Sequence, residues 1–141
     1  MPGAPLVERA RAIASEFLAP RAASADQGTG PPVDQIRRLA EAGLLGLTTT
    51  PEYGGLGAPR NVVRDCLAAV ASGCGVTAFV YFQHLVGCRH LAASANGPLK
   101  ERFLPDLASG NRFCSLAFSH LRRPAPPPLR VRPVGAAWVI D

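Results

Sequence analysis

A histidine and a cysteine four residues apart are the first pair in this sequence whose chemistry and spacing agree. His84 and Cys88 fall on one face of a helix, and that spacing is one that a metal ion accepts. No third ligand follows in register, because Cys74, His90 and His120 suggest no common geometry. We therefore interpret the pair as a buried, hydrogen-bonded histidine beside an inert thiol.

Two adjacent arginines are the second group with a possible chemical role. The guanidinium groups of Arg122 and Arg123 could meet phosphate oxygens, which suit their fork geometry. The alternative, which we favour, is a solvated basic linker. The sequence contains no GxSxG, Walker-type or GxGxxG motif that would indicate hydrolase, nucleotide or dinucleotide chemistry.

Length and composition predict one folded domain of mostly helical character. The chain has 141 residues, of which 48% are hydrophobic, 18% charged and only 6% aromatic. This balance favours helices packed through small side chains. The four cysteines form no CxxC pair, and no basic leader opens the chain, so we expect reduced thiols and a cytoplasmic protein.

Charge and hydropathy exclude two classes of partner. The net charge of +5 comes mostly from four arginines between residues 121 and 133, and the rest of the chain is almost neutral. This distribution does not predict a nucleic-acid-binding face. The longest apolar stretch, residues 75–91, contains Gln83, His84 and Arg89, so we expect no membrane span.

Apolar periodicity and helix-end signals predict about five helices and then the first strands of a sheet. The helices are expected over residues 5–18, 33–42, 62–71, 76–94 and 99–108. Asn61 is a possible cap for the third helix, and the fourth, apolar nearly all round, is expected at the centre of the bundle.

The remaining segments are predicted as loops or extended chain. Residues 24–32 and 48–59 are rich in glycine and proline and are expected to be loops. Residues 112–119 and 135–141 are strand-like, and the proline-rich segment 121–133 between them is expected to be extended.

Three motifs in this order resemble the N-terminal part of the acyl-CoA dehydrogenase family of flavoproteins. They are Leu39-Ala-Glu-Ala-Gly-Leu-Leu-Gly-Leu followed by Pro51-Glu-Tyr-Gly-Gly-Leu-Gly57, then Asn96-Gly-Pro-Leu-Lys-Glu-Arg-Phe-Leu-Pro-Asp-Leu-Ala-Ser-Gly110, and Gly135-Ala-Ala-Trp-Val-Ile-Asp141. The resemblance implies a helical domain over residues 1–111 and the beginning of a middle β-domain over 112–141.

The resemblance also implies a cofactor and candidate site residues. The cofactor would be FAD, contacted by Phe118 and Ser119, with Cys114 packed near the flavin ring. Tyr53, Gly54 and Gly55 would form a loop at the mouth of the acyl-CoA site. The sequence departs from the family at Ser119-His120, where the family usually has Thr-Glu, and the Gly-Ser-rich loop that follows there is absent.

The implied function is α,β-dehydrogenation of an acyl-CoA thioester, as in fatty acid metabolism, by a homo-oligomer. No glutamate here sits in a context that matches the family's catalytic base, which lies in a C-terminal bundle. We therefore expect a fragment that is inactive by itself. Two alternatives stay open: a flavin-dependent monooxygenase-like member of the superfamily, and a non-enzymatic helical interaction module or remnant.

Overall fold

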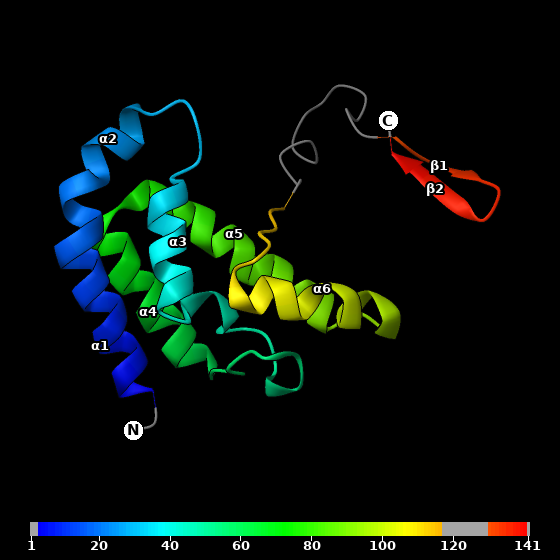
Figure 1. Ribbon diagram of the computed structural model, residues 1–141, viewed down its shortest axis with the longest axis horizontal. Helices are drawn as coiled ribbons and strands as arrows, with labels where there is room; N and C mark the ends of the chain where they lie inside the picture. The colour runs from blue at the N-terminus through cyan, green and yellow to red at the C-terminus, as the bar shows by residue number, and fades with distance from the viewer. Residues whose placement is uncertain (1–2, 117–129, 141) are drawn as a thin grey trace.

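The computed structural model describes residues 3–116 and 130–140, and its fold is mostly helical (Figure 1). The helices are α1 (Ala4–Ile13), α2 (Ala22–Gln27), α3 (Val33–Glu41), α4 (Arg60–Gly73), α5 (Gly75–Ala92) and α6 (Gly97–Ser109). Two strands follow, β1 (Val131–Val134) and β2 (Ala137–Ile140). The predicted class, a helical bundle followed by the first strands of a β-domain, is confirmed.

The helical path does not stop at residue 18, where the sequence predicted the end of the first helix. A π-helical turn over Ala14–Leu18 and a 3-10 turn over Ala19–Arg21 connect α1 directly to α2. Pro20 has no N–H to donate, and the change of helical pitch lets the chain pass it without a clash. The predicted loop over residues 24–32 was therefore wrong in its first part, because α2 extends to Gln27.

The core lies where α1, α4 and α5 pack against one another. Figure 1 shows α1 beside α4, with which it packs, and α5 passing behind α3 toward α6. Ala10 and Val70 are completely buried in this core. A Cβ on Gly73 would lie 2.6 Å from the carbonyl oxygen of Ala14, so a glycine there lets α4 approach the π-helical turn after α1 closely.

Helix α5 is only partly surrounded, although its sequence predicted a central position. Tyr81 and His84 on one face are completely buried. Phe79 on another face is 59% exposed, and Phe82 is 40% exposed. The helix is apolar nearly all round because it contributes to the core and also carries an apolar surface that the described residues leave uncovered.

The helix caps differ from the one that the sequence suggested. Pro59 precedes α4 with no side-chain cap, so the predicted cap at Asn61 was wrong. Asn96 caps α6 by accepting a hydrogen bond from the Leu99 N–H at 3.0 Å. Pro105 lies inside α6, which continues to Ser109.

The two strands form an antiparallel hairpin around Gly135, which has a positive φ of 61°. Val131 pairs with Ile140 and Pro133 with Trp138. Strand β1 lies inside the segment predicted as a proline-rich connection, so that prediction was wrong over residues 131–133. Residues 112–116 are not in a strand, and the rest of the predicted strand, 117–119, lies outside the described residues.

No helix in the described ranges 3–116 and 130–140 is both long enough and apolar enough to cross a membrane.

Candidate functional site

The backbone path of the predicted substrate loop is fixed by hydrogen bonds to the segment that follows α3. Three backbone bonds join its two sides: Leu56 N–H to Gly46 O at 2.9 Å, Gly57 N–H to Thr49 O at 2.7 Å and Ala58 N–H to Leu47 O at 2.8 Å. These bonds hold the loop residues between them in one conformation.

Two glycines in this loop are required by geometry. Gly54 has a positive φ of 77°, which other residues rarely adopt. A Cβ on Gly55 would lie 2.1 Å from the carbonyl oxygen of Thr49, so no larger residue fits. The structure thus places Tyr53, Gly54 and Gly55 together on a rigid turn, and their contact with a substrate stays a prediction.

Tyr53 is the one ionisable side chain among the three predicted loop residues. Partial desolvation and the neighbouring charges of Glu52 and Glu101 raise the pKa of its hydroxyl from 10.0. The hydroxyl therefore stays protonated at neutral pH and is available as a hydrogen-bond donor.

The predicted flavin contacts, Phe118 and Ser119, lie outside the described residues, as do Arg122 and Arg123. The segment that leads to them is fastened to α5. The N–H of Leu116 donates to the Gln83 side-chain oxygen at 3.3 Å.

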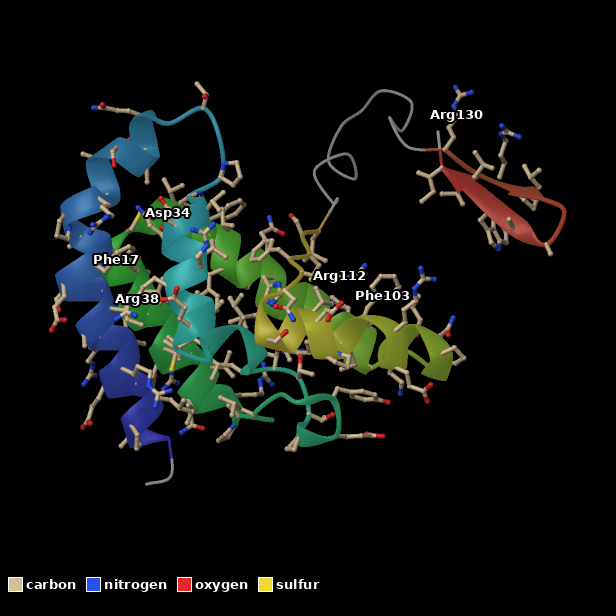
Figure 2. The ribbon with its side chains drawn as sticks, viewed as in Figure 1. Phe17, Asp34, Arg38, Phe103, Arg112 and Arg130 are labelled. Atoms are coloured by element: carbon tan, nitrogen blue, oxygen red, sulfur yellow. The ribbon has the colours of Figure 1, made fainter. Side chains whose placement is uncertain are left out.

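At its other end this segment is held by Arg112 (Figure 2). Its guanidinium donates to Asp106 at 2.8 Å and lies 5.3 Å from the centre of the Phe103 ring. Residues 112–116 are therefore tied to both α5 and α6.

Three side chains that can bind metals or react as nucleophiles meet under this segment. Cys88 Sγ lies 3.4 Å from His84 Nε2 and 4.0 Å from Cys114 Sγ. Cys114 Sγ lies 3.8 Å from His84 Nδ1, and the Cys114 N–H points at the same nitrogen at 3.4 Å. His84 and Cys88 are buried, and Cys114 is partly exposed. We call these three residues the thiol–imidazole cluster.

The pKa values of the two thiols in the cluster are shifted in opposite directions. The hydrogen bond with Cys88 lowers the pKa of Cys114; burial opposes this, and His84 lowers it further. The pKa of Cys88 is raised by the same hydrogen bond and by burial. Cys114 is therefore the first of the two to ionise, and the proton that remains is held on Cys88.

His84 and Cys88 are buried and in contact, as the sequence interpretation expected. The structure adds Cys114, which packs against α5 beside them. Its separation of 26 residues from Cys88 gives no local spacing signal. The one signal in the sequence is Gly87, where a Cβ would lie 2.6 Å from Cys114 Sγ, so that only glycine lets the segment approach this closely.

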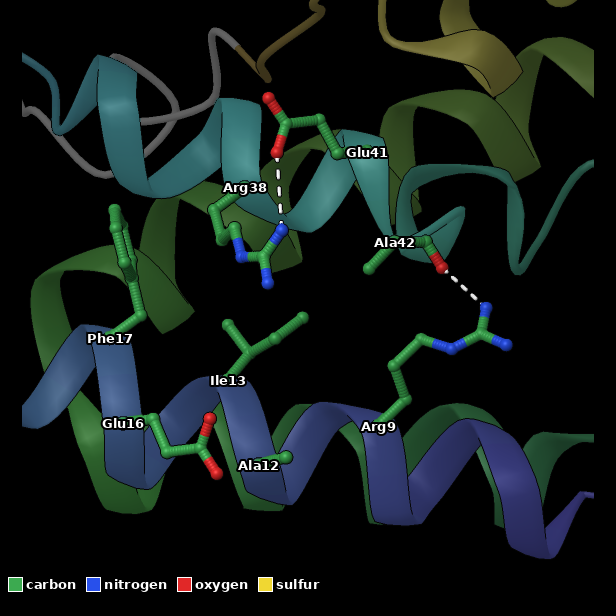
Figure 3. Close-up of a pocket in the computed structure, with 8 residues that line it drawn as sticks. All are labelled: Arg9, Ala12, Ile13, Glu16, Phe17, Arg38, Glu41 and Ala42. Atoms are coloured by element: carbon green, nitrogen blue, oxygen red, sulfur yellow. Dashed lines mark hydrogen bonds and ion pairs between the residues drawn. The ribbon is translucent and has the colours of Figure 1, made fainter.

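A cleft of about 510 Å³ lies between α1 and α3 (Figure 3). Its lining comprises Arg9, Ala12, Ile13, Glu16, Phe17, Arg38, Glu41 and Ala42. Arg9 donates to the Ala42 carbonyl at 2.8 Å, at the end of α3, and Arg38 pairs with Glu41 at 3.3 Å. Because two arginines face two glutamates, the cleft has no excess charge for an ionic ligand, and we assign it a structural role.

Comparison with known proteins places the chain in a family. The acyl-CoA dehydrogenase N-terminal domain matches residues 5–111. Cyclohex-1-ene-1-carbonyl-CoA dehydrogenase of Syntrophus aciditrophicus is 30% identical over 100 residues, which cover 71% of this chain and 24% of that protein. Mitochondrial isovaleryl-CoA dehydrogenase of Arabidopsis thaliana is 31% identical over 112 residues, 76% of this chain and 27% of that protein.

A third relative has a different activity in its name. 3-Sulfinopropanoyl-CoA desulfinase of Paraburkholderia xenovorans is 43% identical over 53 residues, 38% of this chain and 14% of that protein. The chain thus spans about a quarter, or less, of the length of these relatives.

These matches and the fold agree with the resemblance found in the motifs. The chain belongs to the acyl-CoA dehydrogenase family, and it corresponds to the N-terminal helical domain.

Proposed function

We propose that this chain is the N-terminal part of an FAD-dependent oxidoreductase that introduces an α,β double bond into an acyl-CoA thioester. The observation that carries the proposal is the match to the family's N-terminal domain over residues 5–111. In this proposal residues 1–111 form the helical domain and 112–141 begin the β-domain. The protein would act in the cytoplasm, as a homo-oligomer, on acyl-CoA from fatty acid metabolism.

In this proposal the turn at residues 53–55 and the segment after residue 111 have separate roles, which the described geometry supports. The rigid turn at Tyr53, Gly54 and Gly55 would border the acyl-CoA site, with the Tyr53 hydroxyl as a hydrogen-bond donor. Phe118 and Ser119 would contact the flavin, which when bound accepts a hydride from the substrate's β-carbon. The attachment of residues 112–116 to α5 and α6 would set the direction from which those contacts are made.

One relative's name gives a reason to keep a second function in view. A protein named as a desulfinase is similar to this chain over 53 residues, so similarity in this region does not by itself fix the reaction. The replacement of the family's Thr-Glu by Ser119-His120 lies at the predicted flavin contact. The second candidate is therefore a flavin-dependent oxygenase of the same superfamily.

The experiment has two parts, and the first uses the 141-residue chain itself. The purified chain is mixed with FAD, passed through gel filtration and examined for flavin absorbance, and is then assayed with a panel of acyl-CoA thioesters. We expect no stoichiometric flavin and no turnover. Retained flavin would overturn this expectation and allow the reaction to be assayed on the chain alone.

The second part reads the gene past codon 141 and assays the longer product if the frame continues. Reduction of an artificial electron acceptor by acyl-CoA supports the dehydrogenase, whereas substrate-dependent oxygen consumption supports the oxygenase. A stop codon directly after Asp141 would instead favour the interaction module, tested by affinity capture of partners.

The proposed substrate turn is tested on the same longer product. A Tyr53→Ala variant should raise the KM for acyl-CoA, because it removes the hydroxyl that would face the substrate. The matched control is Leu56→Ala, a change at an exposed residue of the same turn, which should leave the KM unchanged. Equal KM values for the two variants would remove Tyr53 from the proposed site.

A further inference from the structure

The thiol–imidazole cluster has the dimensions of a tetrahedral metal site. Zinc bonds of about 2.3 Å to sulfur and about 2.0 Å to nitrogen place two sulfurs about 3.8 Å apart and a sulfur and a nitrogen about 3.5 Å apart. The corresponding distances here are 4.0 Å between the sulfurs of Cys88 and Cys114 and 3.4 Å from Cys88 Sγ to His84 Nε2. Cys114 Sγ lies 3.8 Å from the other ring nitrogen, Nδ1, so the imidazole has to shift for one nitrogen to share an ion with both sulfurs. All three ligand atoms lie within 4.8 Å of one another.

The kinds of ligand select the kind of metal. Two thiols and one imidazole, with no carboxylate in the group, suit zinc or monovalent copper and disfavour magnesium or calcium. Three protein ligands leave one coordination position for a water molecule or another small ligand. Cys114 is partly exposed, which gives an ion a route to two otherwise buried ligands.

The fold holds the three ligands in place without a metal. His84 and Cys88 are one helical turn apart on α5. Cys114 is brought to them by the Arg112–Asp106 ion pair on one side and the Leu116–Gln83 hydrogen bond on the other. A site whose ligands are already positioned loses little conformational entropy when it binds an ion.

A buried hydroxyl lies beside the Cys88 thiol and favours its thiolate form. Thr49 is completely buried, and its Oγ1 has no hydrogen-bond partner among the described residues. The hydroxyl faces the Cys88 sulfur, where it favours the thiolate form. An unsatisfied buried hydroxyl costs stability, and a hydrogen bond to a metal-bound thiolate would remove that cost.

We propose that His84, Cys88 and Cys114 bind one thiolate-preferring metal ion, with zinc as the probe, and that Thr49 is a positioning residue for the Cys88 thiolate. On binding, each thiol releases its proton to solvent and donates a sulfur lone pair to the ion. His84 donates the Nε2 lone pair in the tautomer that carries its proton on Nδ1, so the contact of the Cys114 N–H with Nδ1 is given up. No electrons are exchanged. The ion would join α5 to the segment that leads out of the helical domain.

The test uses the whole chain, freed of any histidine tag and kept reduced. Cobalt is titrated in, and the spectrum is followed for the ligand-field bands of a tetrahedral ion and for thiolate-to-metal charge transfer. Zinc affinity is then measured by competition with a chromogenic chelator. We expect one ion per chain, thiolate charge transfer, and displacement of cobalt by zinc.

Variants separate this site from adventitious binding. Cys114→Ala and Cys88→Ser should each weaken zinc binding more than about 100-fold, and Thr49→Val by about 10-fold. Two matched controls should leave it unchanged: Cys66→Ala, a buried thiol in α4, and His90→Gln, an exposed imidazole on α5.

If Cys88→Ser fails to fold, the zinc affinity of Cys114→Ala tests the proposal alone. Cys114 lies outside the helices, so this variant should keep its helical content, which far-UV circular dichroism verifies. Equal zinc affinity in Cys114→Ala and Cys66→Ala would overturn the proposal. So would the absence of thiolate charge transfer in the reduced wild-type chain. A Cys88–Cys114 disulfide that forms readily, together with no metal binding after reduction, would overturn it in favour of a redox pair.

Discussion

Tyr81 is the largest of the side chains that the described helices bury completely, and its hydroxyl makes a hydrogen bond. The hydroxyl donates to the Leu44 carbonyl at 2.7 Å, which joins α5 to the turn after α3. Removing the hydroxyl would leave that buried carbonyl without this donor. The cost of an unsatisfied buried group is about 1–3 kcal/mol.

We therefore expect Tyr81→Phe to lower the free energy of unfolding by about 1–3 kcal/mol. Tyr53→Phe, at a partly exposed tyrosine, should change it by less than about 0.5 kcal/mol. Urea unfolding followed by far-UV circular dichroism measures both. Equal effects of the two changes would contradict the role assigned to the Tyr81 hydroxyl.

Cys66 is a buried thiol whose ionisation couples stability to alkaline pH. Burial, and then the charge of Asp65, raise the pKa of Cys66 from 9.0 to about 11. The folded protein therefore keeps this proton at pH values where the unfolded chain has lost it. Its contribution to stability is fully present below about pH 9 and is lost as the pH rises toward about 11.

The Cys66→Ala variant should lose stability less steeply than the wild type over this range. Burial and then the Cys66 charge raise the pKa of Tyr81, so its contribution to the pH dependence is also smaller in Cys66→Ala, which lacks that charge. Urea unfolding at a series of pH values gives the two slopes. Parallel curves between pH 9 and 11 would show that the Cys66 thiol ionises in the folded protein as it does in the unfolded chain.

At the scale of elements, the start of α6 depends on one side chain and the start of α4 does not. Asn96 accepts the Leu99 N–H, whereas Asn61 lies inside α4. Asn96→Ala should therefore cost about 1 kcal/mol of stability. Asn61→Ala, the matched change at the residue that the sequence suggested as a cap, should stay within about 0.5 kcal/mol. Thermal unfolding of the two variants tests the assignment, and a larger loss in Asn61→Ala would reverse it.

The helices were predictable because their signals are local. Gly43 and Gly110 follow the helices predicted over residues 33–42 and 99–108, and their positive φ values of 72° and 85° are those of residues that end helices. Helix α2 was missed because the glycines and prolines of residues 28–32 dominate the pattern around it. The thiol–imidazole cluster was missed for another reason: Cys114 reaches His84 only through the tertiary path fixed by Gly87 and Gln83.

At the scale of the whole molecule, the buried core is contained in the helical part of the described chain. The buried apolar residues run from Ala10 to Ala108. The hairpin contributes none of them, and Trp138 in β2 is 68% exposed. Two strands alone are marginally stable in water, so the hairpin is not expected to support the helices.

A chain shortened to residues 1–116 should therefore unfold at nearly the same temperature as the full 141-residue chain. The truncation removes no core residue. We therefore expect the two unfolding midpoints to differ by less than about 2 °C, since a loss of 1 kcal/mol corresponds to roughly 4 °C or more for a domain of this size. Because the shortened chain keeps His84, Cys88 and Cys114, zinc should raise both midpoints equally. As a control, a chain shortened to residues 1–111 loses Cys114 and should lose the response to zinc. A much lower midpoint for residues 1–116 without zinc would show that residues after 116 contribute to the core, and the helical domain would then have to be defined with them.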